Sequence, residues 1–203
     1  MTRLRVAQVL AVVATLAVLG TAAVTATRPR EGDGRSRSSR PEPAAVSLAV
    51  RDPTSGASFE VPGDDWQVED RRIRLYYADA AGDPVAVVRG PAVFRSGYCA
   101  ARPKGSNHAF AGFTEQEFGA WVEALGRAAS ETASSVRLAD GTAAQLRRAH
   151  VDLVGSGPCA APAADVAMVR VGDVRVVLVA DAGVPGALQE EQVAQILTSL
   201  RLP

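Results

Sequence analysis

The side chains best suited to chemistry in this sequence are two cysteines and two histidines. Cys99 and Cys159 are the only cysteines, and His108 and His150 are the only histidines. A thiol beside an imidazole is the smallest pair that a thiol hydrolase needs, because the imidazole takes the proton of the attacking sulfur. One hypothesis is therefore a hydrolase built on Cys99 with His108 or His150, oriented by a nearby Asp or by Asn107.

The two cysteines also allow a purely structural interpretation. They lie about 60 residues apart, each in a segment rich in Gly and Pro. An even number of cysteines behind an export signal favours a disulfide, and a loop of that size stabilises a fold by about 4 kcal/mol in the chain-entropy account. Because a Cys99–Cys159 disulfide leaves no nucleophile, we favour a domain without enzymatic activity. Two buried thiols in a reducing compartment are the alternative.

No motif of a known catalytic or cofactor site accompanies these residues. The sequence lacks the patterns His-Glu-x-x-His, Cys-x-x-Cys, Gly-Lys-Ser/Thr and Gly-x-Ser-x-Gly, which mark zinc, redox, phosphate and serine-hydrolase sites. Two histidines are too few for a histidine-based metal site without carboxylate ligands. We therefore expect neither a metal nor a cofactor.

An apolar segment near the N-terminus bears on the compartment of the whole chain. Val6–Ala26 contains no charged residue, and as a helix it would extend roughly 30 Å, the thickness of the hydrocarbon core of a bilayer. Arg3 and Arg5 precede it, and Val24-Thr25-Ala26 resembles a small-residue cleavage site. Because secretory h-regions are usually about 7–15 residues long, we favour an uncleaved single span over a cleaved signal.

The arginines around this segment leave its orientation open. Five of them follow it, namely Arg28, Arg30, Arg35, Arg37 and Arg40. Counted by the positive-inside rule, they would keep the C-terminal side in the cytoplasm. The signal-like N-terminus and the cysteine pair favour export instead. We expect an extracytoplasmic domain on a single-pass anchor, or a secreted one if the segment is cleaved, with a cytoplasmic-facing membrane accessory domain as the alternative.

Composition divides the chain into three segments. Residues 1–27 form the transmembrane anchor or signal, and residues 28–45 are built from Arg, Ser, Gly and Pro without apolar periodicity. Such a linker cannot bury enough surface to offset its ordering entropy, so we expect it to be disordered. Residues 46–203 are sufficient for one domain. This domain carries 15 basic and 19 acidic residues without a basic stripe, which argues against nucleic acid as a partner.

Hydrophobic patterning within residues 46–203 predicts many short strands. We expect strands at Val46–Val50, Ser58–Val61, Arg72–Tyr77, Val85–Arg89, Ala92–Arg95, Ser135–Leu138, Ala143–Val154, Asp165–Val171 and Val174–Asp181. Alternation and turn residues between them indicate sequential hairpins. Val174–Ala180 is apolar at nearly every position, which is typical of a central strand covered on both faces.

Two amphipathic segments predict helices. The first is expected over Glu115–Thr132, with Thr114 and Glu117 as a capping box and with Trp121 on the apolar stripe that enters the core. The second is expected over Leu188–Leu200. Hairpin strands with two longer helices indicate an α+β fold, in which helices pack on a mainly antiparallel sheet.

Three aromatic residues are candidates for contact with a ligand or partner. They are Trp66, Tyr76 and Tyr98, and each also has an ordinary interpretation as a packing residue. The missing catalytic motifs, beside a fold framed by a disulfide, favour a membrane-tethered, non-enzymatic domain of the cell envelope. We expect its partner to be an envelope protein or a small apolar ligand.

Several short motifs resemble a domain of unknown function in actinobacterial envelope proteins. They are the opening segment Phe59-Glu60-Val61-Pro62-Gly63-Asp64-Asp65-Trp66, the triplet Gly97-Tyr98-Cys99 with the second cysteine Cys159, and the closing Ile196-Leu197-x-Ser199-Leu200-Arg201. More loosely, residues 46–203 are similar to the PsbP-like fold of LpqN-type lipoproteins. The resemblance implies a sheet backed by helices, an extracytoplasmic location and binding or scaffolding without catalysis. This chain has no lipobox cysteine, so a lipid anchor is not expected.

Overall fold

The computed structural model describes residues 46–78, 82–94, 109–153 and 160–203. The anchor segment 1–27, the linker 28–45 and both cysteines lie outside these ranges. Within them, no helix is both long enough and apolar enough to cross a membrane.

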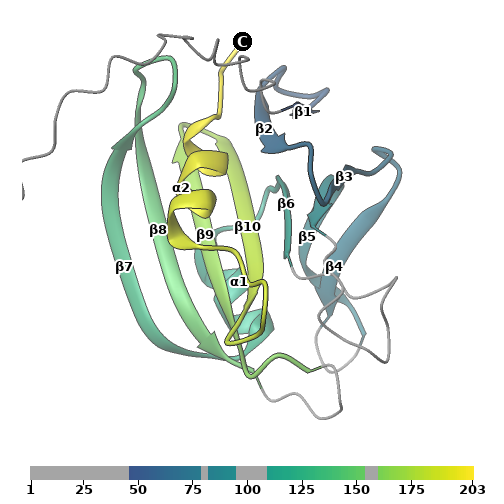
Figure 1. Ribbon diagram of the computed structural model, residues 1–203, viewed down its shortest axis with the longest axis vertical. Helices are drawn as coiled ribbons and strands as arrows, with labels where there is room; N and C mark the ends of the chain where they lie inside the picture. The colour runs from purple at the N-terminus through teal and green to yellow at the C-terminus, as the bar shows by residue number, and fades with distance from the viewer. Residues whose placement is uncertain (1–45, 79–81, 95–108, 154–159) are drawn as a thin grey trace, which may run out of the picture. The chain divides into compact units, whose positions relative to one another are not determined.

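Most of the described domain is one antiparallel sheet (Figure 1). Its eight strands are β3 (Trp66–Val68), β4 (Arg74–Ala78), β5 (Pro84–Phe94), β6 (Ala109–Phe113), β7 (Arg127–Arg137), β8 (Ala143–Asp152), β9 (Ala163–Val171) and β10 (Val174–Ala182). They follow the order β3-β5-β6-β10-β9-β8-β7, with β4 also paired to β5. The expected central strand is confirmed, because β10 lies between β6 and β9 and is buried on both faces from Val176 to Ala180.

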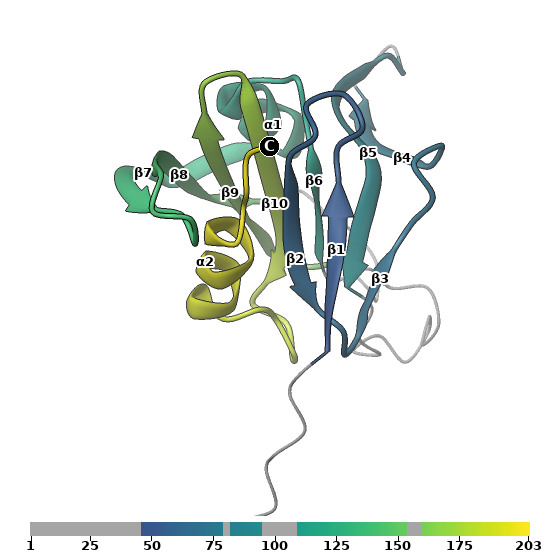
Figure 2. The same cartoon turned by 90° about the horizontal axis from the view of Figure 1, so that it is seen from above.

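The two faces of this sheet are covered by different elements. Helix α2 (Glu190–Thr198) and the small sheet of β1 (Ser47–Arg51) and β2 (Ser58–Pro62) cover one face, which we call the α2 side. Helix α1 (Phe118–Leu125) covers the other face, the α1 side (Figure 2). A mainly antiparallel sheet with two helices confirms the expected α+β class.

Each side has its own apolar core. On the α2 side, Phe59 of β2 and Leu178 of β10 pack with Ile196 and Leu200 of the α2 segment. Arg201 adds a short bridge to β2, in which the Ser58 amide donates to the Arg201 carbonyl at 3.0 Å and the Arg201 amide donates to the Ser58 carbonyl at 2.7 Å. The helix predicted over Leu188–Leu200 is confirmed, with the shorter bounds Glu190–Thr198.

On the α1 side, Trp121 lies at the centre of an aromatic cluster. Its ring is fully buried, 6.0 Å from the centroid of Phe110 and 6.2 Å from that of Tyr77. Phe118 packs in the same core. The expectation that Trp121 is a core residue is therefore confirmed.

The helix predicted over Glu115–Thr132 is wrong in its second half. Helix α1 stops at Leu125, and residues 127–137 form strand β7. Gly126 makes the break with a φ of 153°, and a Cβ there would lie 2.8 Å from the Asp152 carbonyl oxygen. A side chain at this position would collide with β8, so only glycine allows the chain to turn from helix to strand here.

The predicted capping box of this helix is also wrong. Glu117 itself is the N-cap of α1 and makes no side-chain capping bond. The hydroxyl of Thr114 is used elsewhere, as described below. The remaining hairpins agree with expectation, since β1–β2, β7–β8 and β9–β10 pair as sequential antiparallel partners.

Candidate functional site

A shallow groove lies on the α2 side, between the beginning of α2 and strands β7–β9. Its volume is about 260 Å³. Five of its lining residues are apolar, namely Ala149, Val166, Ala167, Leu188 and Val193, and six are polar, namely Ser130, Thr132, Arg148, His150, Asp165 and Glu190. We call this feature the α2 groove. Its apolar residues come from β8, β9, α2 and the turn before α2, while most of its polar residues belong to the strands of the sheet.

Three of the polar residues form one row across neighbouring strands. Ser130 of β7 is directly opposite His150 of β8, and His150 is directly opposite Asp165 of β9. Directly opposite residues of an antiparallel pair project from the same face. The Nδ1 atom of His150 lies 2.6 Å from an oxygen of Asp165, which leaves Nε2 as the ring nitrogen for a further partner.

A β-bulge decides that Ser130 belongs to this row. The register between β7 and β8 shifts between Ala128, opposite Val151, and Ser130, opposite His150. Without the extra residue, Ser130 would face the α1 side, because a shift by one residue moves every side chain to the other face. The bulge therefore directs both Ser130 and Thr132 toward the α2 groove.

The second row combines a hydroxyl with an ion pair. Thr132 is opposite Arg148, and the guanidinium of Arg148 pairs with Glu190 in the first turn of α2. The Nε atom of Arg148 is buried and has no hydrogen-bond partner among the described residues. Because Glu190 is largely exposed, this pair contributes little to stability. It does set a cation and an anion beside the apolar residues of the groove.

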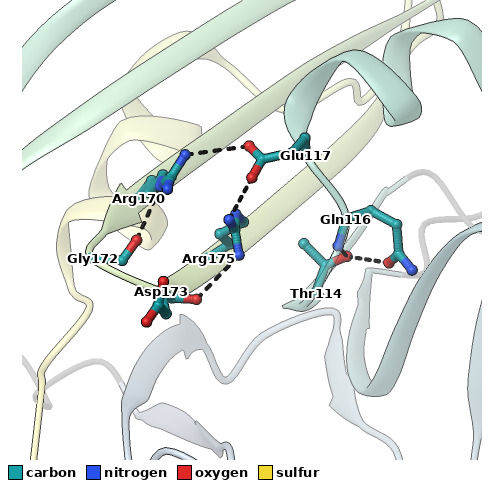
Figure 3. Close-up of polar contacts among 7 residues, drawn as sticks. All are labelled: Thr114, Gln116, Glu117, Arg170, Gly172, Asp173 and Arg175. Atoms are coloured by element: carbon teal, nitrogen blue, oxygen red, sulfur yellow. Dashed lines mark hydrogen bonds and ion pairs between the residues drawn. The ribbon is translucent and has the colours of Figure 1, made fainter.

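A separate polar cluster lies at the N-terminus of α1 (Figure 3). Glu117 accepts bonds from Arg170 of β9, at 3.3 Å, and from Arg175 of β10, at 2.5 Å. The same two arginines donate to the carbonyls of Gly172 and Asp173 in the turn between their strands. A carboxylate at a helix N-terminus is also favoured by the helix dipole. This cluster therefore fastens α1 to the β9–β10 hairpin.

Thr114 joins the same end of α1 to the core. Its buried hydroxyl oxygen accepts a bond from the indole N–H of Trp121 at 3.3 Å and one from the Gln116 amide at 3.2 Å. The hydroxyl proton can go to the Val87 carbonyl, at 3.0 Å, or to the Gln116 side-chain oxygen, at 2.7 Å. With every bond directed inward, the Thr114 network serves the fold.

Of the residues singled out from the sequence, one histidine reaches the groove. His150 lies there, while Cys99, Cys159, His108 and Tyr98 fall outside the described residues. The cysteine pairing therefore stays a prediction.

The other two aromatic candidates are at different places. The Trp66 ring is buried on the α2 side, 5.4 Å from the centroid of Phe94, so little of it is exposed to a partner. Tyr76 lies on β4 opposite Val87, and its side chain is not among those described.

Sequence reasoning missed the other polar residues of the groove. The sequence pattern predicts a helix at Ser130, and it connects neither Arg148 nor Asp165 with His150. The signal that could have found this pair is the succession of the two strands β8 and β9. They pair antiparallel, and their register sets His150 directly opposite Asp165. In the parts of the chain that the structure describes, no three His, Cys, Asp or Glu residues are grouped so that they could hold a metal ion.

The fold and the groove together define a class, namely an antiparallel α+β domain with an open, partly apolar groove beside an edge strand. Comparison of the sequence with family models gives the family. The chain belongs to the family described as Domain of unknown function (DUF8017), whose model matches residues 47–124 and 117–203. Searches of curated proteins and of solved structures give no match.

Proposed function

We propose that this chain is a membrane-tethered, non-enzymatic domain of the cell envelope, and that the α2 groove binds a segment of a partner protein. The observation that carries the proposal is the composition of the groove. Apolar side chains of Leu188 and Val193 lie beside polar groups that are already oriented by their own pairs, Arg148 with Glu190 and His150 with Asp165. A few positioned polar groups around an apolar surface are typical of binding sites.

The size of the groove favours a protein segment over a free small molecule. Pockets for drug-sized ligands enclose about 300–1,000 Å³ and surround most of the ligand. At about 260 Å³, the α2 groove has room for one or two side chains of a partner. An apolar side chain would contact Leu188 and Val193, and the partner backbone would find donors and acceptors along the polar row.

The location rests on the N-terminal segment and on the resemblance to envelope proteins. Val6–Ala26 is uncharged and long enough to span a bilayer, and the linker 28–45 would keep the domain close to the membrane. Within this proposal, the arrangement of sheet and helices is PsbP-like, as in LpqN-type proteins of actinobacteria. A Cys99–Cys159 disulfide would suit an oxidising exterior.

Site-specific photo-cross-linking in the native cells tests the groove. A benzophenone amino acid at position 188 should give one discrete adduct, and the same amino acid at the exposed Ile73 (44% exposed) is the matched control. Arg148→Ala should reduce the adduct from position 188, because it removes the cation beside the apolar residues. Identical products from both positions, or none from position 188, would contradict binding in the groove.

A topology reporter tests the location separately. An alkaline phosphatase fused after Pro203 should be active, since the enzyme works only outside the cytoplasm. A reporter that is active only in the cytoplasm would instead favour the cytoplasmic-facing accessory domain, and would remove the reason for a disulfide.

A hydrolase is the second candidate, and the row of Ser130, His150 and Asp165 favours it. The carboxylate bound to Nδ1 would hold the imidazole so that Nε2 can accept a proton from a nucleophile. The described residues include no hydrogen bond between Ser130 and His150, so this candidate ranks below binding. A fluorophosphonate probe would test Ser130, and iodoacetamide would test Cys99. Labelling of the wild-type chain that His150→Ala abolishes would establish the hydrolase, and no labelling by either reagent would exclude it.

A further inference from the structure

Strand β7 is an exposed edge of the large sheet. It pairs with β8 on one side, and no other described strand pairs with its outer side. Figure 1 shows β7 at the margin of the sheet, beyond the area that α2 covers. Of its 11 residues, nine are exposed and only Ala128 and Val136 are partly covered. Within the described ranges, the outer row of backbone N–H and C=O groups is therefore open to another strand.

The usual protections against strand pairing are weak on β7. The segment RAASETASSVR contains neither Lys nor Pro, which natural proteins place on free edges to prevent association. Its one bulge lies between Ala128 and Ser130, and from Ser130 to Arg137 it pairs with β8 in continuous register. Most side chains along this part are small, so a second backbone can approach without steric conflict.

We propose that β7 pairs antiparallel with β7 of a second copy of this chain, about a two-fold axis that passes through Ser134. Residues 131–137 of each copy then form the contact, and the two large sheets continue into one another. Such an interface is isologous, since each copy contributes the same surface.

The charges on β7 select this register. With the axis at Ser134, Glu131 of one copy is directly opposite Arg137 of the other, and this pair occurs twice. Both residues project from the α1 side, where Glu131 also pairs with Arg147. Opposite charges in directly facing positions stabilise a strand pair, and like charges destabilise it.

The other symmetric registers are less favourable. An axis at Thr132 sets Arg127 of one copy opposite Arg137 of the other, which is a repulsive pair on each side. An axis at Ala129 sets Arg127 opposite Glu131, but it runs through the bulge, where regular pairing is interrupted. The Ser134 axis alone combines a regular strand with two attractive pairs.

The contact is small, so association should be reversible and dependent on concentration. Seven residues from each copy bury less surface than the roughly 1,200 Å² at which stable interfaces begin. The expected dimer is therefore of the weak class, with dissociation in the micromolar range or above.

Cysteine cross-linking of the full chain tests the register directly. Residues facing each other across the axis have Cα atoms about 4.5–5.5 Å apart, within the range that a disulfide bridges. Ser134→Cys should thus form a disulfide-linked dimer under mild oxidation. Thr132→Cys is the matched control, because two copies of residue 132 would lie four residues apart along the strands, about 13 Å. Both substitutions fall in the tryptic peptide 128–137, so mass spectrometry separates the new cross-link from any through Cys99 or Cys159.

Charge exchange tests the same register without cysteines. Glu131→Arg and Arg137→Glu should each raise the dimer dissociation constant by about tenfold or more, since each replaces two attractive pairs by two repulsive ones. An equimolar mixture of these two variants should recover association, and so should the double variant E131R/R137E. Sedimentation velocity over a concentration series compares these four samples with the wild-type chain. Monomeric wild-type chain, single variants that associate like wild type, or cross-linking of Thr132→Cys at least as efficient as that of Ser134→Cys would each overturn the proposal.

Discussion

Replacing Thr114 by valine should destabilise the domain through lost hydrogen bonds alone. Valine has nearly the same shape as threonine, so the packing changes little. The substitution removes the acceptor of the Trp121 indole N–H and of the Gln116 amide, together with the donor that the Val87 carbonyl can use. Because the Trp121 ring is fully buried, water cannot replace the lost acceptor of its N–H.

The magnitude follows from the number of groups left without a partner. Each typical hydrogen bond contributes about 1 kcal/mol net, and a buried group left unpaired costs about 1–3 kcal/mol. We therefore expect Thr114→Val to lower the free energy of unfolding by about 2–4 kcal/mol. Thr114→Ser is the matched control, because it keeps the hydroxyl and removes one methyl group, at a cost of about 1 kcal/mol.

Urea unfolding followed by tryptophan fluorescence measures both variants. The midpoint should shift strongly for valine and weakly for serine, with an unchanged dependence on denaturant concentration. If valine stays within about 0.5 kcal/mol of wild type, or if serine is as destabilising as valine, then the Thr114 hydroxyl does not hold α1 on the sheet and the reasoning fails.

Three further substitutions give distinct outcomes. Burial, with a smaller contribution from the charge of Asp181, raises the pKa of Tyr77 to about 12, while the unfolded chain ionises near 10. The stability due to neutral Tyr77 is therefore complete below pH 10 and falls as the pH rises from about 10 to 12; denaturant midpoints across this range should fall less in Tyr77→Phe. Leu178→Ala, at a fully buried position of the central strand, should cost about 3–5 kcal/mol, measured as a loss of melting temperature. Glu117→Gln should cost only about 1 kcal/mol, because the carboxylate is largely exposed, and the loss should shrink in high salt.

Prediction from the sequence succeeded where a local pattern reports burial directly. The run of apolar residues in Val174–Asp181 indicated a strand covered on both faces, and β10 has that position. The spacing of Trp121 on an apolar stripe likewise indicated a core residue, and its ring is fully buried. In the helix, the side chains that meet the core recur at the helical period, and in the central strand they occupy successive positions because both faces are covered.

Prediction failed where few of the residues contact a core. Nine of the eleven residues of β7 are exposed, so the strand shows little alternation. Over residues 127–132, the alanines and Glu131 extend the helical pattern of α1, whereas the strand expected at Ser135–Leu138 agrees with the end of β7. What makes this segment a strand is its pairing with β8, a contact that the composition of residues 127–137 does not encode. The break at Gly126 is equally tertiary, since it depends on the Asp152 carbonyl of β8.

The sequence by itself determined the class of this domain, its central strand and its apolar core. Core positions are occupied by apolar residues, and the pattern of these residues along the chain indicates the element that buries them. Only the tertiary structure decided which polar side chains share a site. The row of Ser130, His150 and Asp165 joins residues of three strands, and it depends on one bulge and two registers. Register is set by cross-strand hydrogen bonds and by the packing of whole sheets, and a shift of one residue would take Ser130 to the opposite face.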